Sequence, residues 1–150
     1  MNVQIQENQN VLSYLSRTGP KELLISPSDS THDPYIELGS HPDIVERVWD
    51  ELGTTISPES RQIVCDNPAF VHPITGVVFA LTLGTRYVLK LTPEIAKQAK
   101  RDGFRTIHTW SDGRSIDIEA ELGLGWIFGQ WSPLEPSWLN EIYAPLIFSP

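Results

Sequence analysis

The chain has 150 residues, of which 40% are hydrophobic and 20% charged, as in an ordinary globular domain. Eleven Lys and Arg against nineteen Asp and Glu give a net charge of −8, which disfavours a protein that coats nucleic acid. The single cysteine, Cys65, excludes an internal disulfide and a cysteine-rich zinc site and suits a reducing compartment. The polar start and the absence of about eighteen consecutive apolar residues predict a cytoplasmic protein without a membrane span.

The N-terminal part of the chain is predicted to lie outside the main domain. Residues 8–17 place three apolar side chains at helical spacing, and residues 26–40 are rich in Ser, Asp and Pro, which predicts a loop. The three apolar residues are Val11, Leu12 and Leu15. We expect residues 1–40 to form an arm that packs at the periphery or mediates self-association through these three side chains. Residues 41–150 are expected to form a single α+β domain.

Two segments begin with residues that favour the start of a helix. Residues 40–53 open with Ser-His-Pro-Asp, carry an apolar stripe and end at Gly53, which together predict a helix. Residues 57–65 open with Ser-Pro-Glu and predict a shorter helix, which the following Asp-Asn-Pro would end.

A β-hairpin is predicted in the middle of the chain. Residues 77–83 and 86–91 are rich in β-branched and aromatic side chains and flank a Gly-Thr pair, which indicates a two-residue turn. Thr-Pro-Glu then starts a helix that is expected to end at Gly103. A strand over 125–128 and a last helix with Trp138 facing inward follow near the C-terminus.

A second hairpin is predicted over residues 104–122, around the Asp112-Gly113 turn. A two-residue turn would place His108 opposite Asp117, whose carboxylate would raise the pKa of the histidine. It would also direct four apolar side chains to the core, namely Ile107, Ile116, Ile118 and Ala120. The acidic row Asp117, Glu119 and Glu121 would then lie along one strand face, as a solvated surface or, alternatively, a weak cation site. Hairpins with helices at both ends predict an α+β layer structure.

Five segments between residues 66 and 146 resemble a known family. They read NPAFVHP at 67–73, GVVFALTLGTRYVLKL at 76–91, PEIAKQAKRDGF at 93–104, GWI at 125–127 and SWLNEIYAPL at 137–146. Their order resembles the MmcQ/YjbR family, which is related to the TfoX N-terminal domain, over about half the chain. The resemblance implies a frataxin-like two-layer sandwich, in which helices pack on one face of an antiparallel sheet. It also implies the DNA-binding label often given to that family. It brings no catalytic residues.

The histidines and carboxylates raise the question of a metal site. His32 and His41 lie among acidic residues that could act as ligands, namely Asp29, Asp33, Glu37 and Asp43. No pair has the i, i+4 spacing of a helical metal motif, so an acidic loop is the better interpretation. We therefore expect no metal and no cofactor.

No catalytic group is predicted from the sequence. Cys65 ends an apolar segment, as a buried thiol would, and no serine lies in a nucleophile elbow. The Gly-Leu-Gly at 123–125 lacks the rest of a phosphate-binding loop. Trp126 and Trp131, which flank Phe128, are the candidates to line a pocket, against the alternative of core packing.

Basic residues are concentrated in one window of the chain. Residues 86–114 contain seven of the eleven Lys and Arg but only three acidic residues. The candidate binding residues in this window are Lys97, Lys100, Arg101 and Arg105. The first three share one face of the predicted helix from Pro93, which is a basic patch or a solvated face near the helix C-terminus.

Three functions from different classes remain. The leading hypothesis is a non-enzymatic interaction module for an unknown protein or small ligand, without a membrane partner. The alternative is a nucleic-acid-binding protein that uses the basic helix face at 86–114, although the net charge disfavours it. The third is an enzyme, which would need His72 or His108 beside a carboxylate in a cleft.

Overall fold

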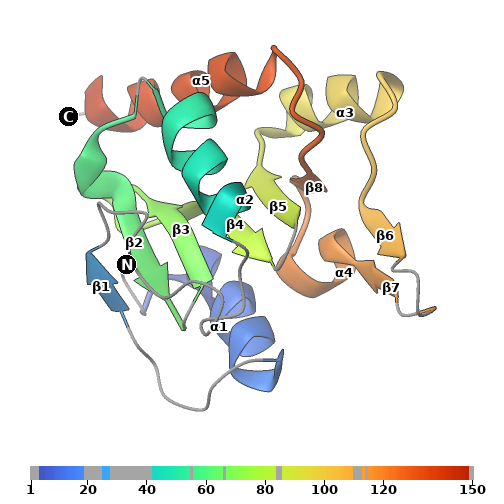
Figure 1. Ribbon diagram of the computed structural model, residues 1–150, viewed down its shortest axis with the longest axis horizontal. Coiled ribbons are helices and arrows are strands. Elements are labelled where there is room, and N and C mark those ends of the chain that lie inside the picture. Colours follow the sequence, from blue (N-terminus) through green and yellow to red (C-terminus); the bar gives the residue numbers. More distant parts are fainter. Residues whose placement is uncertain are drawn as a thin grey trace.

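The computed structural model describes residues 4–18, 25–27, 42–54, 56–65, 67–83, 86–109, 113 and 115–148. At its centre is an antiparallel sheet with the strand order β1-β2-β3-β4-β5-β8 (Figure 1). These strands are β1 (Ile25–Pro27), β2 (Arg61–Val64), β3 (Asn67–Val71), β4 (Val78–Leu83), β5 (Arg86–Lys90) and β8 (Trp126–Phe128). A separate two-stranded ribbon pairs β6 (Ile107–Thr109) with β7 (Ser115–Asp117).

Helices connect and cover these strands. They are α1 (Gln6–Thr18), α2 (Pro42–Arg47), the π-helical turn η1 (Val48–Leu52), the 3-10 turn η2 (Pro58–Ser60), α3 (Pro93–Arg101), α4 (Ile118–Leu122) and α5 (Glu135–Phe148). None of the described helices is long and apolar enough to cross a membrane.

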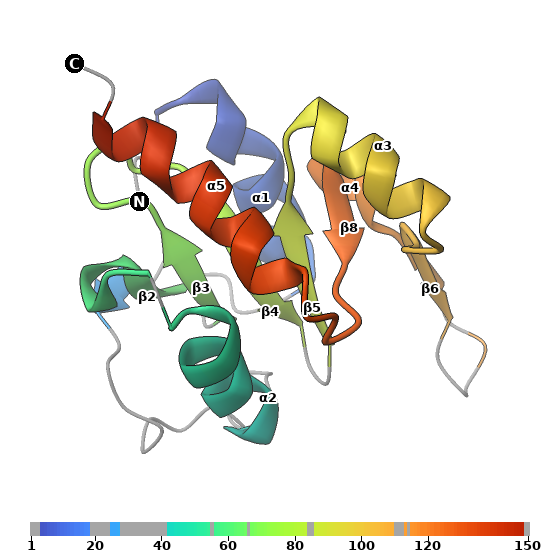
Figure 2. The ribbon, with the colours of Figure 1, turned by 90° about the horizontal axis from the view of Figure 1, so that it is seen from above.

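Both faces of the central sheet are buried. Alternate residues of a strand point to opposite faces, so Leu89 and Val88 of β5 enter two different hydrophobic clusters. The cluster around Leu89 contains side chains of α2, η1, α3 and α5, and the cluster around Val88 contains side chains of α1 and α4. Figure 2 shows α2 and α1 on opposite sides of the sheet. The α+β class and the antiparallel sheet are as predicted, but helices pack on both faces rather than on one.

The helix predicted near the N-terminus forms, and it lies inside the core. Val11 and Leu15 of α1 are 0% and 1% exposed. Asn8 of the same helix donates a hydrogen bond to Gly76 O at 2.8 Å and accepts one from Val78 N at 3.0 Å. The packed unit therefore includes α1, and the boundary predicted at residue 40 does not set this helix apart. Self-association through Val11 and Leu15 would require α1 to leave the sheet.

The helix predicted over residues 57–65 is wrong. Ser57 accepts a hydrogen bond from Glu59 N and starts a single 3-10 turn, η2, after which the chain becomes β2. The residues Ile63 and Val64 are β-branched, and they pair with β3 across a tight turn at Cys65. The Ser-Pro-Glu sequence does start a helical turn, but pairing with β3 makes the following residues, Arg61–Val64, a strand.

The hairpin β4–β5 forms at the predicted place, with Leu83 opposite Arg86. The two connecting residues, 84 and 85, lie outside the described residues, so the turn type stays a prediction. The helix that follows, α3, has the expected N-cap, because Thr92 Oγ1 accepts a hydrogen bond from Ile95 N. In α5, Trp138 is buried as predicted, and Leu139 and Tyr143 are buried too.

The second hairpin differs from the prediction by one residue. His108 lies opposite Ile116 and Ile107 opposite Asp117, so His108 and Asp117 are not paired. The helix α4 begins at Ile118 because Asp117 Oδ1 accepts hydrogen bonds from the backbone N–H groups of Glu119 and Ala120 and so caps the helix. Ile118 is buried as expected, but Ile107 is 54% exposed and Ala120 is exposed.

Candidate functional site

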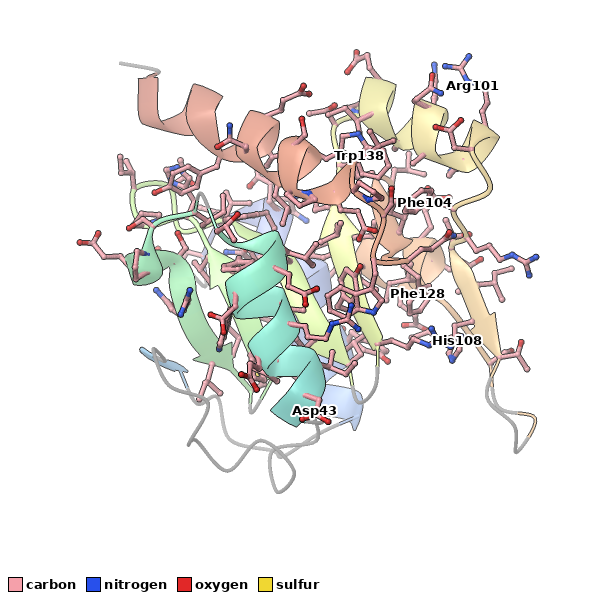
Figure 3. The ribbon with its side chains drawn as sticks, turned by 45° about the horizontal axis from the view of Figure 1, so that its top comes forward. Asp43, Arg101, Phe104, His108, Phe128 and Trp138 are labelled. Atoms are coloured by element: carbon pink, nitrogen blue, oxygen red, sulfur yellow. The ribbon has the colours of Figure 1, made fainter. Side chains whose placement is uncertain are left out.

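A groove lies where the chain leaves α3 and enters β6. Its volume is about 710 Å³, within the usual range of ligand sites. It is lined by Lys100, Phe104, Arg105, Thr106, Ile107, His108 and Thr109. Figure 3 shows Phe104, Phe128 and His108 on the side of the molecule where β6 runs.

Backbone bonds to the central sheet hold the start of this segment. Phe128 N of β8 donates to Arg105 O at 3.0 Å, so the chain follows the sheet edge for one residue. Ile118 N then donates to Thr106 O at 2.8 Å, which begins the ribbon. The buried ring of Phe104 packs edge-on against Trp138 of α5, with the ring centroids 5.1 Å apart. One end of the groove is therefore anchored in the core, while the strand beyond it is exposed.

Two of the predicted basic residues contribute to the groove. Lys100 Nζ forms an ion pair with Glu119 Oε2 of α4 at 2.7 Å, which partly neutralises it. Arg105 is exposed, and it forms no ion pair with the residues that the structure describes. Arg105 is thus a groove cation that has no anionic partner within the described ranges.

The other two predicted basic residues lie outside the groove. Lys97 and Arg101 are exposed on α3, and neither contributes to the lining. Arg101 Nη2 donates a hydrogen bond to Gln98 Oε1 on the same helix. The basic window therefore divides into a groove part, Lys100 and Arg105, and an outer helix face.

The electrostatic environment of His108 is opposite to the prediction. Its ring packs against Phe128, with the centroids 5.6 Å apart. Burial lowers the pKa of His108 below its ordinary value, and the nearby Arg86 lowers it further. The expected rise depended on Asp117, which the observed register places opposite Ile107.

The two candidate pocket aromatics do not share a pocket. Trp126 is 1% exposed and belongs to the cluster beneath α1 and α4. Trp131 packs on the opposite face of the sheet, where Tyr87 and the Arg47 guanidinium contact its ring. Core packing, the alternative weighed for these residues, describes Trp126.

The predicted acidic row does not form along a strand. Asp117 caps α4, and Glu119 pairs with Lys100. Within the described ranges, no three His, Cys, Asp or Glu side chains are close enough to hold a metal ion. His32 and His41 lie outside these ranges. Cys65 is a free, buried thiol.

His72 is a buried part of the β3–β4 turn. Its side chain is 0% exposed, its ring packs on Tyr143, and its Nδ1 accepts hydrogen bonds from the N–H groups of Ile74 and Thr75. Burial lowers the pKa of His72 below its ordinary value, and the nearby backbone of Tyr143 opposes this shift. The neutral ring therefore shapes the turn and does not stand in a cleft.

A second polar cluster lies at the start of α5. The buried carboxylate of Glu135 accepts hydrogen bonds from Tyr87 Oη and from the backbone N–H groups of Gln130 and Ser132. Burial raises the pKa of Glu135, and burial together with Glu135 raises that of Tyr87. Since both carboxylate oxygens are engaged, the cluster holds the loop before α5.

Sequence reasoning missed several groove residues and the Glu135 cluster. The sequence predicts a strand that contains Thr106, Ile107 and Thr109, and the predicted register directs Ile107 to the core. The signal for Glu135 was present, because Ser-x-x-Glu at 132–135 is a capping-box pattern before an apolar helix. The groove had no comparable signal, because it depends on where β6 leaves the sheet.

Comparisons with models of protein families, with curated proteins and with solved structures find no match to this chain.

Proposed function

We propose that this protein is a non-enzymatic interaction module that binds an anionic partner in the groove between α3 and β6. The observation that carries the proposal is the combination of a concave site with the exposed cation Arg105 and the exposed apolar residue Ile107. A concave site with apolar surface and a few charged groups is what a specific binding site requires.

The charge of the site differs from that of the rest of the protein. The chain carries a net charge of −8, whereas the charged residues on the groove lining are the cations Lys100 and Arg105. Screening over about 8 Å at physiological salt limits the repulsion that distant acidic residues exert on a bound anion. A short anionic ligand therefore fits the groove better than a long polyanion, which would also meet the acidic surface.

The surroundings of the two histidines favour binding over acid–base catalysis. The enzyme hypothesis required a carboxylate beside His72 or His108 in a cleft. Arg86 is the charged group that shifts the pKa of His108, and His72 is enclosed by the β3–β4 turn and Tyr143. A histidine next to a cation is a weak general base, because its lowered pKa reduces its basicity.

Nucleic-acid binding remains the alternative, and the exposed α3 residues Lys97 and Arg101 support it. Two features count against it. Lys100, the residue between them, is paired with Glu119, and the basic lining is concave rather than a ridge that tracks a phosphate backbone. The two interpretations predict different effects of substitutions on α3.

The experiment measures binding of three anionic probes by calorimetry: a short acidic peptide, inorganic pyrophosphate and a short oligothymidylate. Arg105→Ala removes a groove cation, and Lys97→Ala removes one outside the groove, so the two variants have equal net charge. We expect at least one probe to bind, with about tenfold weaker binding for Arg105→Ala and little change for Lys97→Ala.

Other outcomes would contradict the proposal. If no probe binds, or if both substitutions weaken binding equally, the groove is not an anion site. If oligothymidylate alone binds, with losses in Lys97→Ala and Arg101→Ala and a steep salt dependence, the nucleic-acid alternative takes its place.

A further inference from the structure

The backbone of β6 has one edge that faces away from β7. In an antiparallel pair, residues alternate between those that bond the neighbouring strand and those that point their N–H and C=O outward. Thr106 O accepts the N–H of Ile118, and His108 lies opposite Ile116, so Thr106 and His108 face β7. The backbone groups of Ile107 and Thr109 therefore point to the outer edge.

Among the described residues, this outer edge has no partner strand. The ribbon consists of β6 and β7 alone, and within the described part of the chain no strand pairs with the other side of β6. No hydrogen bond engages the backbone of Ile107 or Thr109 among the described residues. An edge of this kind is a template for an added strand.

The groove follows the same edge. Four consecutive residues from Thr106 to Thr109 line it, although their side chains alternate between the two faces of the ribbon. No residue of β7 is part of the lining. A cavity that meets both faces of β6 but not β7 lies along the outer edge of the strand.

We propose that this groove binds an extended acidic peptide, which adds as a strand to the outer edge of β6. Its backbone bonds the N–H and C=O groups of Ile107 and Thr109, and its carboxylates meet Arg105 and Lys100. This inference rests on the proposed function and specifies the chemistry of the partner. Strand addition obtains affinity from main-chain hydrogen bonds and specificity from the side chains along the strand.

Charge complementarity selects this occupant over a second copy of the chain. Pairing of two β6 edges would bring the exposed Arg105 of each copy to one interface, whereas Lys100 of each copy is already paired with its own Glu119. Like charges brought together across paired strands destabilise the pairing. An acidic peptide supplies the anions that such a dimer lacks.

The test uses an acetylated and amidated peptide of alternating Glu and Val, together with the same peptide N-methylated at alternate residues. The two peptides have the same charge and side chains, but the methylated one cannot donate its backbone bonds on one edge. We expect the unmodified peptide to bind at least about tenfold more tightly, because several backbone hydrogen bonds are lost in the other. Methylation in each of the two possible frames is required, since either edge can face β6.

Amide hydrogen exchange locates the added strand. The N–H groups of Ile107 and Thr109 are expected to exchange rapidly in the free protein and to become protected when the unmodified peptide binds. Ile107→Pro removes one outward N–H, and Ile107→Ala retains it while shortening the same side chain. Peptide binding should fall much further in Ile107→Pro than in Ile107→Ala, with circular dichroism as the check on folding.

The outcomes separate this inference from the function on which it rests. Equal affinity for the peptide and both methylated forms, lost in Arg105→Ala, would overturn strand addition and leave an anion-binding groove. Binding of pyrophosphate or oligothymidylate but not of the peptide would also overturn strand addition and leave an anion-binding groove. Absence of binding by every probe would overturn both proposals. Protection of Ile107 in the free protein that rises with protein concentration would assign the edge to a second copy instead.

Discussion

The two hairpins of this protein look alike in sequence but differ in structure. Both have two segments of β-favouring residues around a glycine-containing turn. The β4–β5 hairpin forms at its predicted position inside the central sheet, whereas the β6–β7 ribbon is shifted by one residue and projects at the side of the molecule (Figure 1).

Burial on both faces explains the difference. In β5, Val88 and Leu89 are both 0% exposed and contact different helical layers, so a shift by one residue would exchange side chains between two filled cores. In β6, Ile107 and Thr109 are exposed, and a shift moves little apolar surface. A strand register is well specified only where packing penalises the alternatives.

The same contrast separates stability from binding. The central hairpin carries side chains of both cores, and its backbone is paired on each side by β3 and β8. The ribbon contributes little to the core but leaves an open edge beside two cations. Four predictions test this division of roles, in order of decreasing expected effect.

The largest expected difference is between core and ribbon truncations. Leu89→Ala is expected to lower the free energy of unfolding by roughly 2–5 kcal/mol, because it leaves a cavity between the sheet and α5. Ile107→Ala is expected to change it by less than about 0.5 kcal/mol, since the side chain is 54% exposed. Chemical denaturation measures both values. A loss above about 1.5 kcal/mol for Ile107→Ala would show that the ribbon is part of the core.

A pair of glycines gives the next contrast. A Cβ at Gly129 would lie 1.8 Å from the ring of Tyr87, so Gly129→Ala is expected to cost about 1–3 kcal/mol through overpacking. Gly113, in the loop of the ribbon, has a φ of +90° and nothing within 4 Å of a Cβ. Gly113→Ala should cost only about 1 kcal/mol of backbone strain. Thermal unfolding of both variants checks the order, and equal losses would contradict it.

The pH dependence of stability is expected to come from His72 more than from His108. The pKa of His72 is lowered in the folded protein, so the unfolded chain binds more protons below its ordinary pKa of 6.5. The stabilisation from neutral His72 is therefore complete above that value and is lost as the pH falls below it. The pKa of His108 is also lowered, but its side chain is only partly buried.

His72→Asn keeps an acceptor for the turn and removes the titrating ring. Unfolding measured from neutral to acidic pH should show a flatter decline in this variant than in the wild type. His108→Asn is the matched control and should change the decline less. The reverse order would assign the acid sensitivity to the ribbon.

The smallest expected effect belongs to the ion pair beside the groove. Lys100 and Glu119 have side chains that are 44% and 20% exposed, so Glu119→Gln should cost less than about 1 kcal/mol, and less still at high salt. The same substitution releases Lys100 and should strengthen binding of an acidic peptide. Weaker peptide binding in Glu119→Gln, measured by calorimetry, would contradict the role given to Lys100.

Only the basic residues of the candidate site could be predicted from the sequence. The basic window led to Lys100 and Arg105, because clustered charges can be read directly from the chain. Lys100 and Arg105 line the groove and Lys97 and Arg101 do not, because only one side of α3 faces β6. The Lys100–Glu119 ion pair forms because α4 places Glu119 beside α3. The open edge required the observed register, which an exposed ribbon leaves poorly specified in the sequence.

Local signals by themselves determined where α1, α3, α5 and the β4–β5 hairpin form, because each has an apolar repeat that matches its period and a capping or turn residue next to it in the sequence. Tertiary structure determined the conformation of those segments that could bury the same side chains either as a strand or as a helix. Ile118 and Leu122 can share a face in a strand or a helix, and the cap at Asp117 together with burial against α1 selects the helix. β2 became a strand because β3 pairs with it, and α1 joined the core because the second face of the sheet is apolar. These conformations depend on contacts with segments that are distant in the chain, so no local sequence pattern predicts them.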